Sequence, residues 1–444
     1  MDDAQLVSKA DAVSAINQSL TPVGTFPTTL QPALPVNKLV FAHFIVGNTY
    51  NYSTTNWKAD IILASSKGID AFALNVGSDS WEPSQVANAF FAASALKTSF
   101  KLFLSFDMGS LPCARATDAD LLKTYISTYK THPNQQLIDG KVLVSTFSGS
   151  DCKFEQNTVD NGWKYAIKSG ANANGTYFVP AWFIDPATFS QYTVLDGAFG
   201  WNSGWPMGDY DIDFSQDQAY INNLPSRSYM AAVSPWFYTH YQSKNFIYRS
   251  DDWLLAKRWE DLITHRSSVN FVEVNTWNDY GESHYVGPIE GIQPNSQAWV
   301  DGYDHTAWLD LIKYYISAFK TGTYPTISTD RTFVWGRTYK ANAVATNDPL
   351  PKPDHYTWTD DYIYAVILLR TPATFTLSCG SLTTTSAAPA GLSKFKLGPL
   401  IQSCTVSSKI TRGRTVVNNT YQSKFKFTTA NPSVYNYNAY VAST

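Results

Sequence analysis

The sequence has 444 residues, which suggests a barrel of roughly 250 residues or more with an appendage, or two separate domains. Hydrophobic residues make up 44% of the chain, enough for a large core, so wholesale disorder is excluded. The 33 basic and 36 acidic residues nearly balance, so neither nucleic acid nor an anionic membrane is expected as a partner.

A regular alternation of strand and helix patterns begins at Lys38. Eight short, nearly all-apolar runs are predicted to be strands, and they cover residues 38–47, 69–77, 100–108, 141–147, 177–183, 195–201, 228–238 and 270–277. The helical patterns that follow them cover residues 56–67, 84–98, 118–129, 158–168, 186–192, 215–223, 251–264 and 306–319. All-apolar strands are typical of parallel strands covered by helices, and eight such units favour a closed (β/α)8 TIM-type barrel over an open sheet.

The pattern changes after about Thr321, where helical periodicity ends. Short strands separated by Pro, Gly and Ser/Thr turns are predicted at residues 332–335, 362–369, 373–378, 392–397 and 423–428. This pattern is typical of an antiparallel β-sandwich. We therefore expect an N-terminal arm at residues 1–36, a catalytic (β/α)8 barrel at 37–324 and a β-sandwich accessory domain at 325–444.

The four cysteines lack the spacing of a metal site. Two lie in the barrel region and two in the tail, so we expect the disulfides Cys113–Cys152 and Cys379–Cys404, with four buried free thiols as the alternative. Disulfides indicate an oxidising compartment, so a secreted protein, extracellular or in the cell wall, is expected.

Targeting signals are not evident in the sequence. No run is apolar enough to span a bilayer, and no signal peptide is recognised, so a secreted protein would be in its mature form with Met1 added. Sequons at Asn17, Asn51, Asn174 and Asn418 are compatible with a glycoprotein.

Polar and aromatic side chains follow the predicted strands. The active site of a (β/α)8 barrel lies at the carboxyl ends of its strands, and aromatic residues make up 15% of this chain. Trp and Tyr rings match the apolar faces and hydroxyl rims of sugars, although a large aromatic core explains the composition equally well. The expected substrate-binding residues are His43, Asn48, Tyr50, Asn75, Asp107, Trp182, Trp201, Asn202, Trp236, Tyr238, Asn275, Trp277 and Tyr280.

Two carboxylates stand three residues apart after the eighth predicted strand. Hydrolysis of a glycosidic bond needs one protonated and one ionised carboxyl, and Asp279 and Glu282 could supply them. The alternative is a pair of solvated loop carboxylates. Asp70 begins the second strand, at the opposite face of the barrel, where a charged residue is expected to support the fold. No metal motif, phosphate-binding loop or nucleophile elbow is present, so neither a metal nor an organic cofactor is expected.

Several long blocks resemble a known family. They are FAHFIVGNTYNY (41–52), GIDAFALNVGSD (68–79), LFLSFDM (102–108), GWNSGWP (200–206), SPWFYTHY (234–241), VEVNTWNDYGESHYVGP (272–288) and HYTWTDDYIYAVILL (355–369). They are similar to the fungal endo-1,3-α-glucanases, or mutanases, of glycoside hydrolase family 71. The resemblance runs from about residue 38 to the end of the chain.

The resemblance implies an activity and a mechanism. It implies endo-hydrolysis of α-1,3-glucan, in mutan or the fungal cell wall, with inversion at the anomeric carbon by Asp279 and Glu282. We assign Glu282 as the general acid and Asp279 as the base, and an inverting pair is expected to lie roughly 6.5–9.5 Å apart. The resemblance also makes activity depend on Asp70. A monomer is expected, and the alternatives are a hydrolase of another glucan linkage and a non-catalytic carbohydrate-binding barrel.

Overall fold

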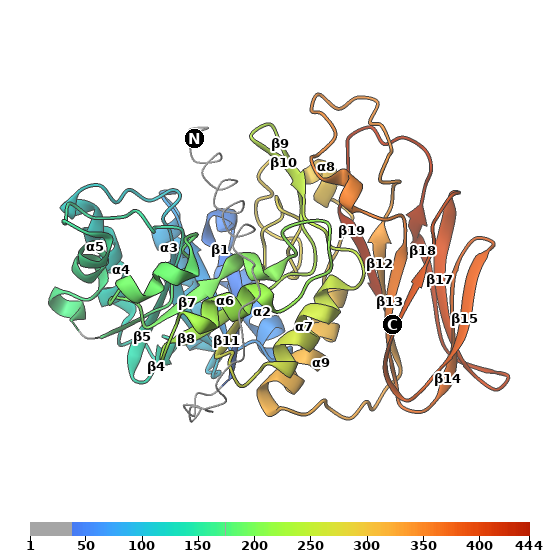
Figure 1. Ribbon diagram of the computed structural model, residues 1–444, viewed down its shortest axis with the longest axis horizontal. Coiled ribbons are helices and arrows are strands. Elements are labelled where there is room, and N and C mark those ends of the chain that lie inside the picture. The colour runs from blue at the N-terminus through green and yellow to red at the C-terminus, as the bar shows by residue number, and fades with distance from the viewer. Residues whose placement is uncertain (1–37, 174) are drawn as a thin grey trace, which may run out of the picture.

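The computed structural model describes residues 38–173 and 175–444, without the side chains of residues 419–423. The expected N-terminal arm, residues 1–36, lies outside the described residues. Within them, eight parallel strands form a curled sheet (Figure 1). The strands are β1 (Leu39–Ile45), β2 (Ala71–Val76), β3 (Lys101–Asp107), β5 (Lys141–Phe147), β6 (Thr176–Phe178), β7 (Gly197–Gly200), β8 (Ser228–Val233) and β11 (Phe271–Val274).

The order of the strands in space follows their order along the chain. The sheet runs β5-β3-β2-β1-β11-β8-β7, with β6 paired to β5, and β4 (Leu137–Ile138) adds an antiparallel strand to β5. Two backbone hydrogen bonds join the remaining two edges, because Asp196 N–H donates to the Phe178 carbonyl (3.0 Å) and Phe199 N–H to the Pro180 carbonyl (2.9 Å). A parallel sheet that closes on itself in chain order is the (β/α)8 arrangement, and the predicted fold class is confirmed.

Helices follow the strands along the chain. They are α2 (Thr54–Ser66), α3 (Glu82–Leu96), α4 (Ala119–Tyr129), α5 (Val159–Ile167), α6 (Ser215–Asn222), α7 (Leu254–Thr264), α8 (Gln297–Val300) and α9 (Ala307–Thr321). Short 3₁₀ turns are η1 (Val46–Thr49), η2 (Ala116–Asp118), η3 (Gly170–Asn172), η4 (Pro186–Gln191), η5 (Trp201–Gly204) and η6 (Tyr356–Trp358). After β6, η4 takes the place of the helix that the pattern predicts.

Alternating side chains of each strand build two layers of core. Phe41 of β1 packs with Ala73, Phe103 and Phe271 in one buried cluster inside the barrel. Its neighbours along β1, Val40, Ala42 and Phe44, belong to the larger cluster between the strands and the surrounding helices. Because both faces of the sheet are buried, both sets are apolar.

Two strands are shorter than predicted because prolines interrupt them. The fifth was expected at residues 177–183 and ends at Phe178, shortly before Pro180. The seventh was expected at residues 228–238 and ends at Val233, before Pro235. Proline has no N–H to donate to a neighbouring strand, so the regular ladder is interrupted there. Beyond Pro180 the pairing resumes, because Ala181 N–H donates to the Thr146 carbonyl (2.8 Å).

The C-terminal region forms two antiparallel sheets. Their strands are β12 (Arg331–Arg337), β13 (Ile363–Leu369), β14 (Ala373–Cys379), β15 (Leu382–Ala388), β16 (Gly391–Leu397), β17 (Cys404–Arg412), β18 (Thr415–Phe427) and β19 (Ala439–Ser443). The four-stranded sheets run β16-β13-β12-β19 and β15-β14-β17-β18, with one apolar cluster shared between them. The sequence prediction missed β15, β17 and β19. The edge strand β15 is mostly exposed and Thr-rich, so it lacks the apolar alternation that identifies a strand.

The first of these sheets packs against the barrel helices α7 and α9 (Figure 1). Trp335 of β12 meets Trp308 of α9 with ring centroids 6.0 Å apart. Arg337 of β12 makes a buried ion pair with Asp251, at 3.2 Å. The barrel and the sheets therefore share a continuous buried contact.

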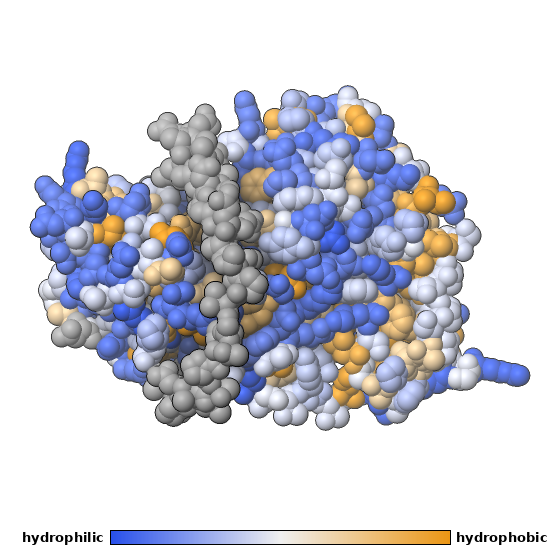
Figure 2. All heavy atoms as spheres, viewed as in Figure 1, coloured by the Kyte–Doolittle hydropathy of each residue, from blue (hydrophilic) through white to orange (hydrophobic). Residues whose placement is uncertain are grey.

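Two disulfides are present as expected. Cys113–Cys152 joins the loops after β3 and β5, and Cys379–Cys404 joins β14 to β17. None of the helices in the described ranges is long and apolar enough to cross a membrane. Figure 2 shows mostly polar residues on the visible face, with apolar residues in small groups.

Candidate active site

The loop after β11 is anchored to both neighbouring strands. Asn275 N–H donates to the Val233 carbonyl of β8 (2.8 Å), and Trp277 N–H donates to the His43 carbonyl of β1 (2.7 Å). The Asn278 side chain accepts from Ile45 N–H (2.7 Å) and donates to the Ile45 carbonyl (3.0 Å). These contacts fix residues 275–278, so the carboxylates that follow are carried on a defined backbone at the carboxyl end of the barrel.

Asp279 and Glu282 converge on one histidine. Nε2 of His284 lies 2.9 Å from Oε2 of Glu282 and 3.4 Å from Oδ2 of Asp279. Asp279 N–H donates to the Thr276 hydroxyl (2.8 Å), and Glu282 N–H donates to Oδ1 of Asp279 (3.1 Å). His284 is fully buried, whereas the two carboxylates remain 23% and 17% exposed and so can be reached by a ligand.

The two carboxylates lie close together. One oxygen of Asp279 and one of Glu282 lie within 4.8 Å of each other. These two oxygens are closer than the roughly 6.5–9.5 Å expected of an inverting pair, and a separation of about 5–5.5 Å is typical of retaining enzymes.

Positive charge gathers beside the pair. The ammonium of Lys244 makes an ion pair with Glu282. Burial by itself would raise the pKa of Asp279, but the hydrogen bond and charge of His284, with the charges of Lys244 and His43, outweigh it and lower that pKa. Asp279 is therefore held in its ionised form. Burial, and next the charge of Asp279, raise the pKa of Tyr241 to about 12.

His43 and Glu273 form a buried pair at the centre of the barrel. Nδ1 of His43 lies 2.7 Å from Oε1 of Glu273, and the edge of the His43 ring meets Trp201 with centroids 4.8 Å apart. Burial raises the pKa of Glu273, although His43 opposes the shift. Glu273 is fully buried, so it orients His43 and does not face a ligand itself.

Asn275 carries an unsatisfied amide. It is fully buried, and neither its oxygen nor its nitrogen has a partner among the described residues. Buried amides are normally paired, so an unpaired one at the carboxyl end of a barrel strand indicates a group kept for a ligand or a water.

The other predicted binding residues differ in exposure. Tyr50 is 57% exposed and meets Trp81 edge to face at 5.1 Å, an arrangement that can offer aromatic surface to a sugar. Trp201 and Asn202 are half-buried, whereas Asn75 is buried. Asn48 is also buried, and its amide donates to the Asn278 carbonyl (2.9 Å).

A second group of carboxylates lies where β2 and β3 end. Glu82 accepts from the Gly77 N–H, and its pKa is raised to about 7, chiefly by burial, with the charges of Asp79 and Asp107 adding to the shift. Asp107 also accepts from the Gly109 N–H (2.9 Å). The predicted binding residue Asp107 therefore belongs to a group of carboxylates at the ends of β2 and β3.

Five of the predicted substrate-binding aromatic residues are core residues. Trp182, Trp236, Tyr238, Trp277 and Tyr280 are at most 1% exposed and belong to the main apolar cluster. A ring buried on both faces cannot stack on a sugar, which corrects the expectation for these residues. The pattern misled because a side chain near a strand end can turn outward toward the helices as easily as inward.

Asp70 lies at the opposite end of the barrel, immediately before β2. Its carboxylate accepts from Val40 N–H (2.8 Å) and pairs with the ammonium of Lys320 (2.6 Å). These contacts suit a residue that supports the fold.

Three residues of the site were not predicted. His284 follows Glu282 by two positions, so its place in the same segment could have suggested it. Lys244 comes from a hairpin far earlier in the chain, and no sequence signal connects it to Glu282. Trp81, which the prediction also missed, is separated from Tyr50 by a helix.

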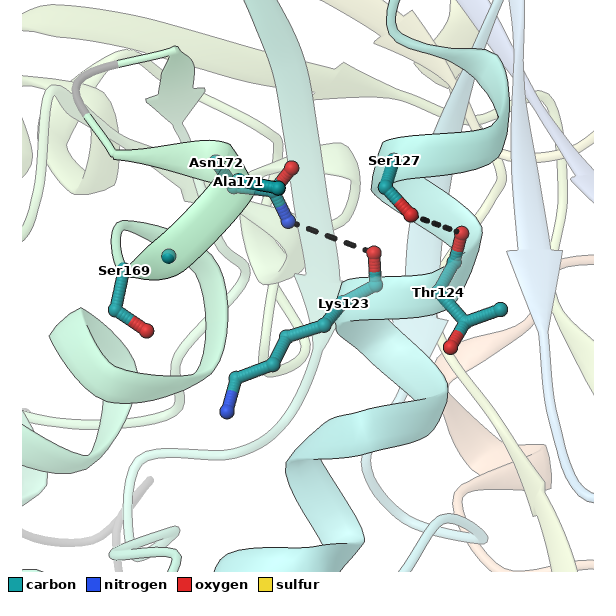
Figure 3. A pocket seen from close by; sticks show the side chains of 7 residues that line it. Lys123, Thr124, Ser127, Ser169, Ala171 and Asn172 are labelled. Atoms are coloured by element: carbon teal, nitrogen blue, oxygen red, sulfur yellow. Dashed lines mark hydrogen bonds between the residues drawn. The ribbon is translucent and has the colours of Figure 1, made fainter.

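Two further places were considered, a possible cation site and a surface pocket. Asp279, Glu282 and His284 have donor atoms close enough together to surround a cation, but Lys244 already neutralises Glu282, so we assign them no metal. A surface pocket between α4 and η3 is lined by Lys123, Ser127 and Asn172 (Figure 3), outside the barrel and without carboxylates or aromatic rings.

The chain is similar to a family of sugar-cleaving enzymes. Residues 36–444 match the model of glycosyl hydrolase family 71. The chain is 40% identical over 411 residues to the glucan endo-1,3-alpha-glucosidase agn1 of Schizosaccharomyces pombe, covering 91% of this chain and 94% of that protein. It is 35% identical to the ascus wall endo-1,3-alpha-glucanase of the same yeast, covering 88% and 93%.

A Penicillium rubens mutanase, Pc12g07500, is 34% identical, covering 92% of this chain and 89% of that protein. Among solved structures, the family 99 endo-alpha-mannosidase of Bacteroides thetaiotaomicron has a TM-score of 0.47 and 10% identity, covering 63% of this chain and 97% of that chain.

Proposed function

The chain belongs to glycosyl hydrolase family 71, and from this premise we propose that it is an endo-1,3-α-glucanase that cleaves α-1,3-glucan within the polymer. Three relatives of 34–40% identity, each covered over nearly its whole length, carry names of this activity. The observation that carries the proposal is the convergence of Asp279 and Glu282 on His284 at the carboxyl end of the barrel.

In the proposed reaction, Glu282 protonates the leaving oxygen and Asp279 activates water. A base must be ionised at the working pH, and the lowered pKa of Asp279 fits that role. Nε2 of His284 lies close to both carboxylates. Water adds to the anomeric carbon as the glycosidic bond breaks, its proton passes to Asp279, and the proton of Glu282 goes to the departing sugar.

The stereochemical course is proposed to be inversion. The short spacing of the two carboxylates is closer to that of retaining enzymes, so the anomer released first is the deciding observation. Proton NMR of a fresh digest should show the β-anomer first, and initial release of the α-anomer would refute inversion.

Substrate assays separate the proposal from its alternatives. Reducing ends should appear with α-1,3-glucan, and a mixture of oligosaccharides should precede glucose if cleavage is internal. Greater release from α-1,4- or β-1,3-glucan would favour a hydrolase of another linkage. No reducing ends from any glucan, together with retention on insoluble α-1,3-glucan, would favour a binding protein.

The surroundings of the enzyme are also proposed. Two disulfides support an extracellular or cell-wall location. The oligomeric state proposed is a monomer. We propose a barrel at residues 37–324 and an accessory sandwich at 325–444, packed too closely to act as a free module. Limited proteolysis that released a stable, active barrel would contradict this division of roles.

A further inference from the structure

A hairpin from the loop after β8 reaches the catalytic pair. It consists of β9 (Tyr238–Tyr241) and β10 (Lys244–Ile247), and it rises above the barrel beside the C-terminal region (Figure 1). Tyr238 N–H donates to the Glu282 carbonyl (3.0 Å), and at the other end of the hairpin the Lys244 ammonium meets the Glu282 carboxylate. The hairpin thus contacts both the backbone and the side chain of Glu282.

The C-terminal region holds this hairpin in place. Nδ1 of His240 lies 2.7 Å from Oδ1 of Asn245, and its Nε2 lies 2.8 Å from Oδ2 of Asp348. The side chains of His240 and Asp348 are both 2% exposed, so this contact is shielded from water. Asp348 also accepts from Tyr435 N–H (2.7 Å), which ties it to the chain leading into β19.

Backbone contacts reinforce the same junction. Asp354 N–H donates to the Asn245 carbonyl (3.0 Å), and Ile247 N–H donates to the Asp354 carbonyl (3.1 Å). The Asn245 amide donates to the Pro351 carbonyl (2.9 Å). Residues 348–354 therefore clasp β10 next to Lys244.

We propose that Lys244 is a positioning residue that sets the charge balance of the Asp279–Glu282 pair, and that Asp348 of the C-terminal region holds it there. The inference rests on the proposed function, since it takes Glu282 to be catalytic. It gives the C-terminal sheets a part in catalysis that does not require them to bind glucan.

The charges around the pair favour this role. Glu282 faces Lys244, His284 and Asp279; Asp279 faces His284, with the charges of Lys244 and His43 and the hydroxyl of Tyr241 nearby. An ammonium beside two carboxylates favours the ionised form of both. The side chain of Lys244 is 36% exposed, so its ion pair with Glu282 contributes little to folding. Its main effect is on the titration of Asp279 and Glu282.

The test is a pH–activity profile on α-1,3-glucan for Lys244→Met and Lys244→Arg. An inverting enzyme loses activity at low pH when its base is protonated and at high pH when its acid is ionised. Because Lys244 acts on both carboxylates, Lys244→Met should move both limbs upward by about one pH unit, so kcat on the low-pH limb should fall roughly tenfold as more of Asp279 is protonated. Lys244→Arg keeps the charge and should restore the profile.

Lys394→Met is the matched control. Lys394 forms an ion pair with Glu260, with 27% and 30% exposure, and joins the C-terminal sheet to the barrel away from the site. Its removal should leave the profile unchanged. A Lys244→Met profile that keeps both limbs in place would overturn the proposal, as would an equal shift in Lys394→Met.

Asp348→Asn tests the second step. The amide keeps the shape of the side chain but removes the negative charge beside His240. On the low-pH limb, kcat should therefore fall about tenfold with KM largely kept. The double variant with Lys244→Met should be no worse than Lys244→Met alone, because both changes act through one contact. Independent, multiplying losses would overturn the link between Asp348 and Lys244.

Glu282→Gln separates this inference from the function on which it rests. If Glu282→Gln keeps its turnover, the catalytic pair is misassigned. If Glu282→Gln is inactive and Lys244→Met leaves the limbs unmoved, only the inference about Lys244 fails.

Discussion

The two ends of the barrel differ in how fully their polar side chains are paired. At the amino ends of the strands, Asp70, Asp196 and Asn270 each precede a strand and accept an N–H of the neighbouring strand, from Val40, Phe178 and Tyr229 respectively. The two aspartates also pair with a lysine, Lys320 for Asp70 and Lys168 for Asp196. Every one of these groups has a local partner, so this end contributes stability.

The carboxyl ends of the strands leave groups crowded or unpaired. Asp279 and Glu282 share His284, and the Asn275 amide has no partner among the described residues. Burial and neighbouring charges raise the pKa of Glu82 to about 7. The same polar residue types therefore stabilise the fold at one end of the barrel and are candidates for catalysis at the other. The difference is whether the fold supplies each polar group with a hydrogen-bond or ion-pair partner.

The largest expected effect comes from the catalytic pair. Glu282→Gln and Asp279→Asn should each lower kcat by about two to four orders of magnitude, because general acid and base act on the transition state. The thermal midpoint should change little, since the ion pair of Glu282 with Lys244 is partly exposed and such pairs contribute little to folding. The exposed Asp185, after β6 at the same end, supplies a control in Asp185→Asn. If both amide variants keep near-normal turnover, Asp107 becomes the next candidate.

Asn270 and Asn275 flank β11 at its two ends, so substituting each tests the difference between the two ends of the barrel. Asn275→Leu should lower kcat/KM by about ten- to a hundredfold if its amide holds a water that meets the sugar. Its thermal midpoint should hold or rise, because a buried unpaired amide costs about 1–3 kcal/mol. Asn270→Leu should do the reverse and destabilise the fold at normal turnover, since it removes the acceptor of Tyr229 N–H. Calorimetry with initial rates distinguishes the two, and identical behaviour of the pair would contradict the contrast.

Asp70 tests the amino end directly. Asp70→Asn keeps an acceptor for Val40 N–H but loses the ion pair with Lys320, so it should cost roughly 1 kcal/mol of stability at unchanged kcat. Lys320→Met should cost a similar amount, and the double variant should lose less than the sum. A fall in kcat without a fall in stability would instead support the dependence of activity on Asp70 that the family resemblance implies.

The remaining prediction is a pH dependence of stability from Glu82. Its folded pKa of about 7 lies above the ordinary 4.5, chiefly because of burial, so the folded state binds the extra proton between these values. Stability should therefore fall as pH rises from 4.5 to about 7. Glu82→Gln should flatten part of this slope in thermal melts between pH 4 and 8, with Asp60, whose pKa is also raised to about 7, retaining the rest. An unchanged slope would show that Glu82 is ionised throughout.

Most of the barrel could be predicted from local patterns. Apolar runs such as Leu39–Ile45 and Ala71–Val76 must be buried on both faces, and their regular alternation with helices leaves few other folds. The sandwich was harder to predict, because the edge strand β15 faces solvent and shows no periodicity. Strand ends were misplaced where Pro180 and Pro235 interrupt the regular ladder.

Sequence patterns were enough to predict the fold class, the two disulfides and the segment that carries Asp279 and Glu282. Periodic burial identifies the strands and helices, and two cysteines in each region suggest one disulfide within each. Three-dimensional packing settles which aromatic rings are core, that the Asn275 amide lacks a partner among the described residues and that Lys244 reaches Glu282. Those features depend on which way a side chain turns and on contacts between segments far apart in sequence, where three-dimensional packing alone sets the distance between charges.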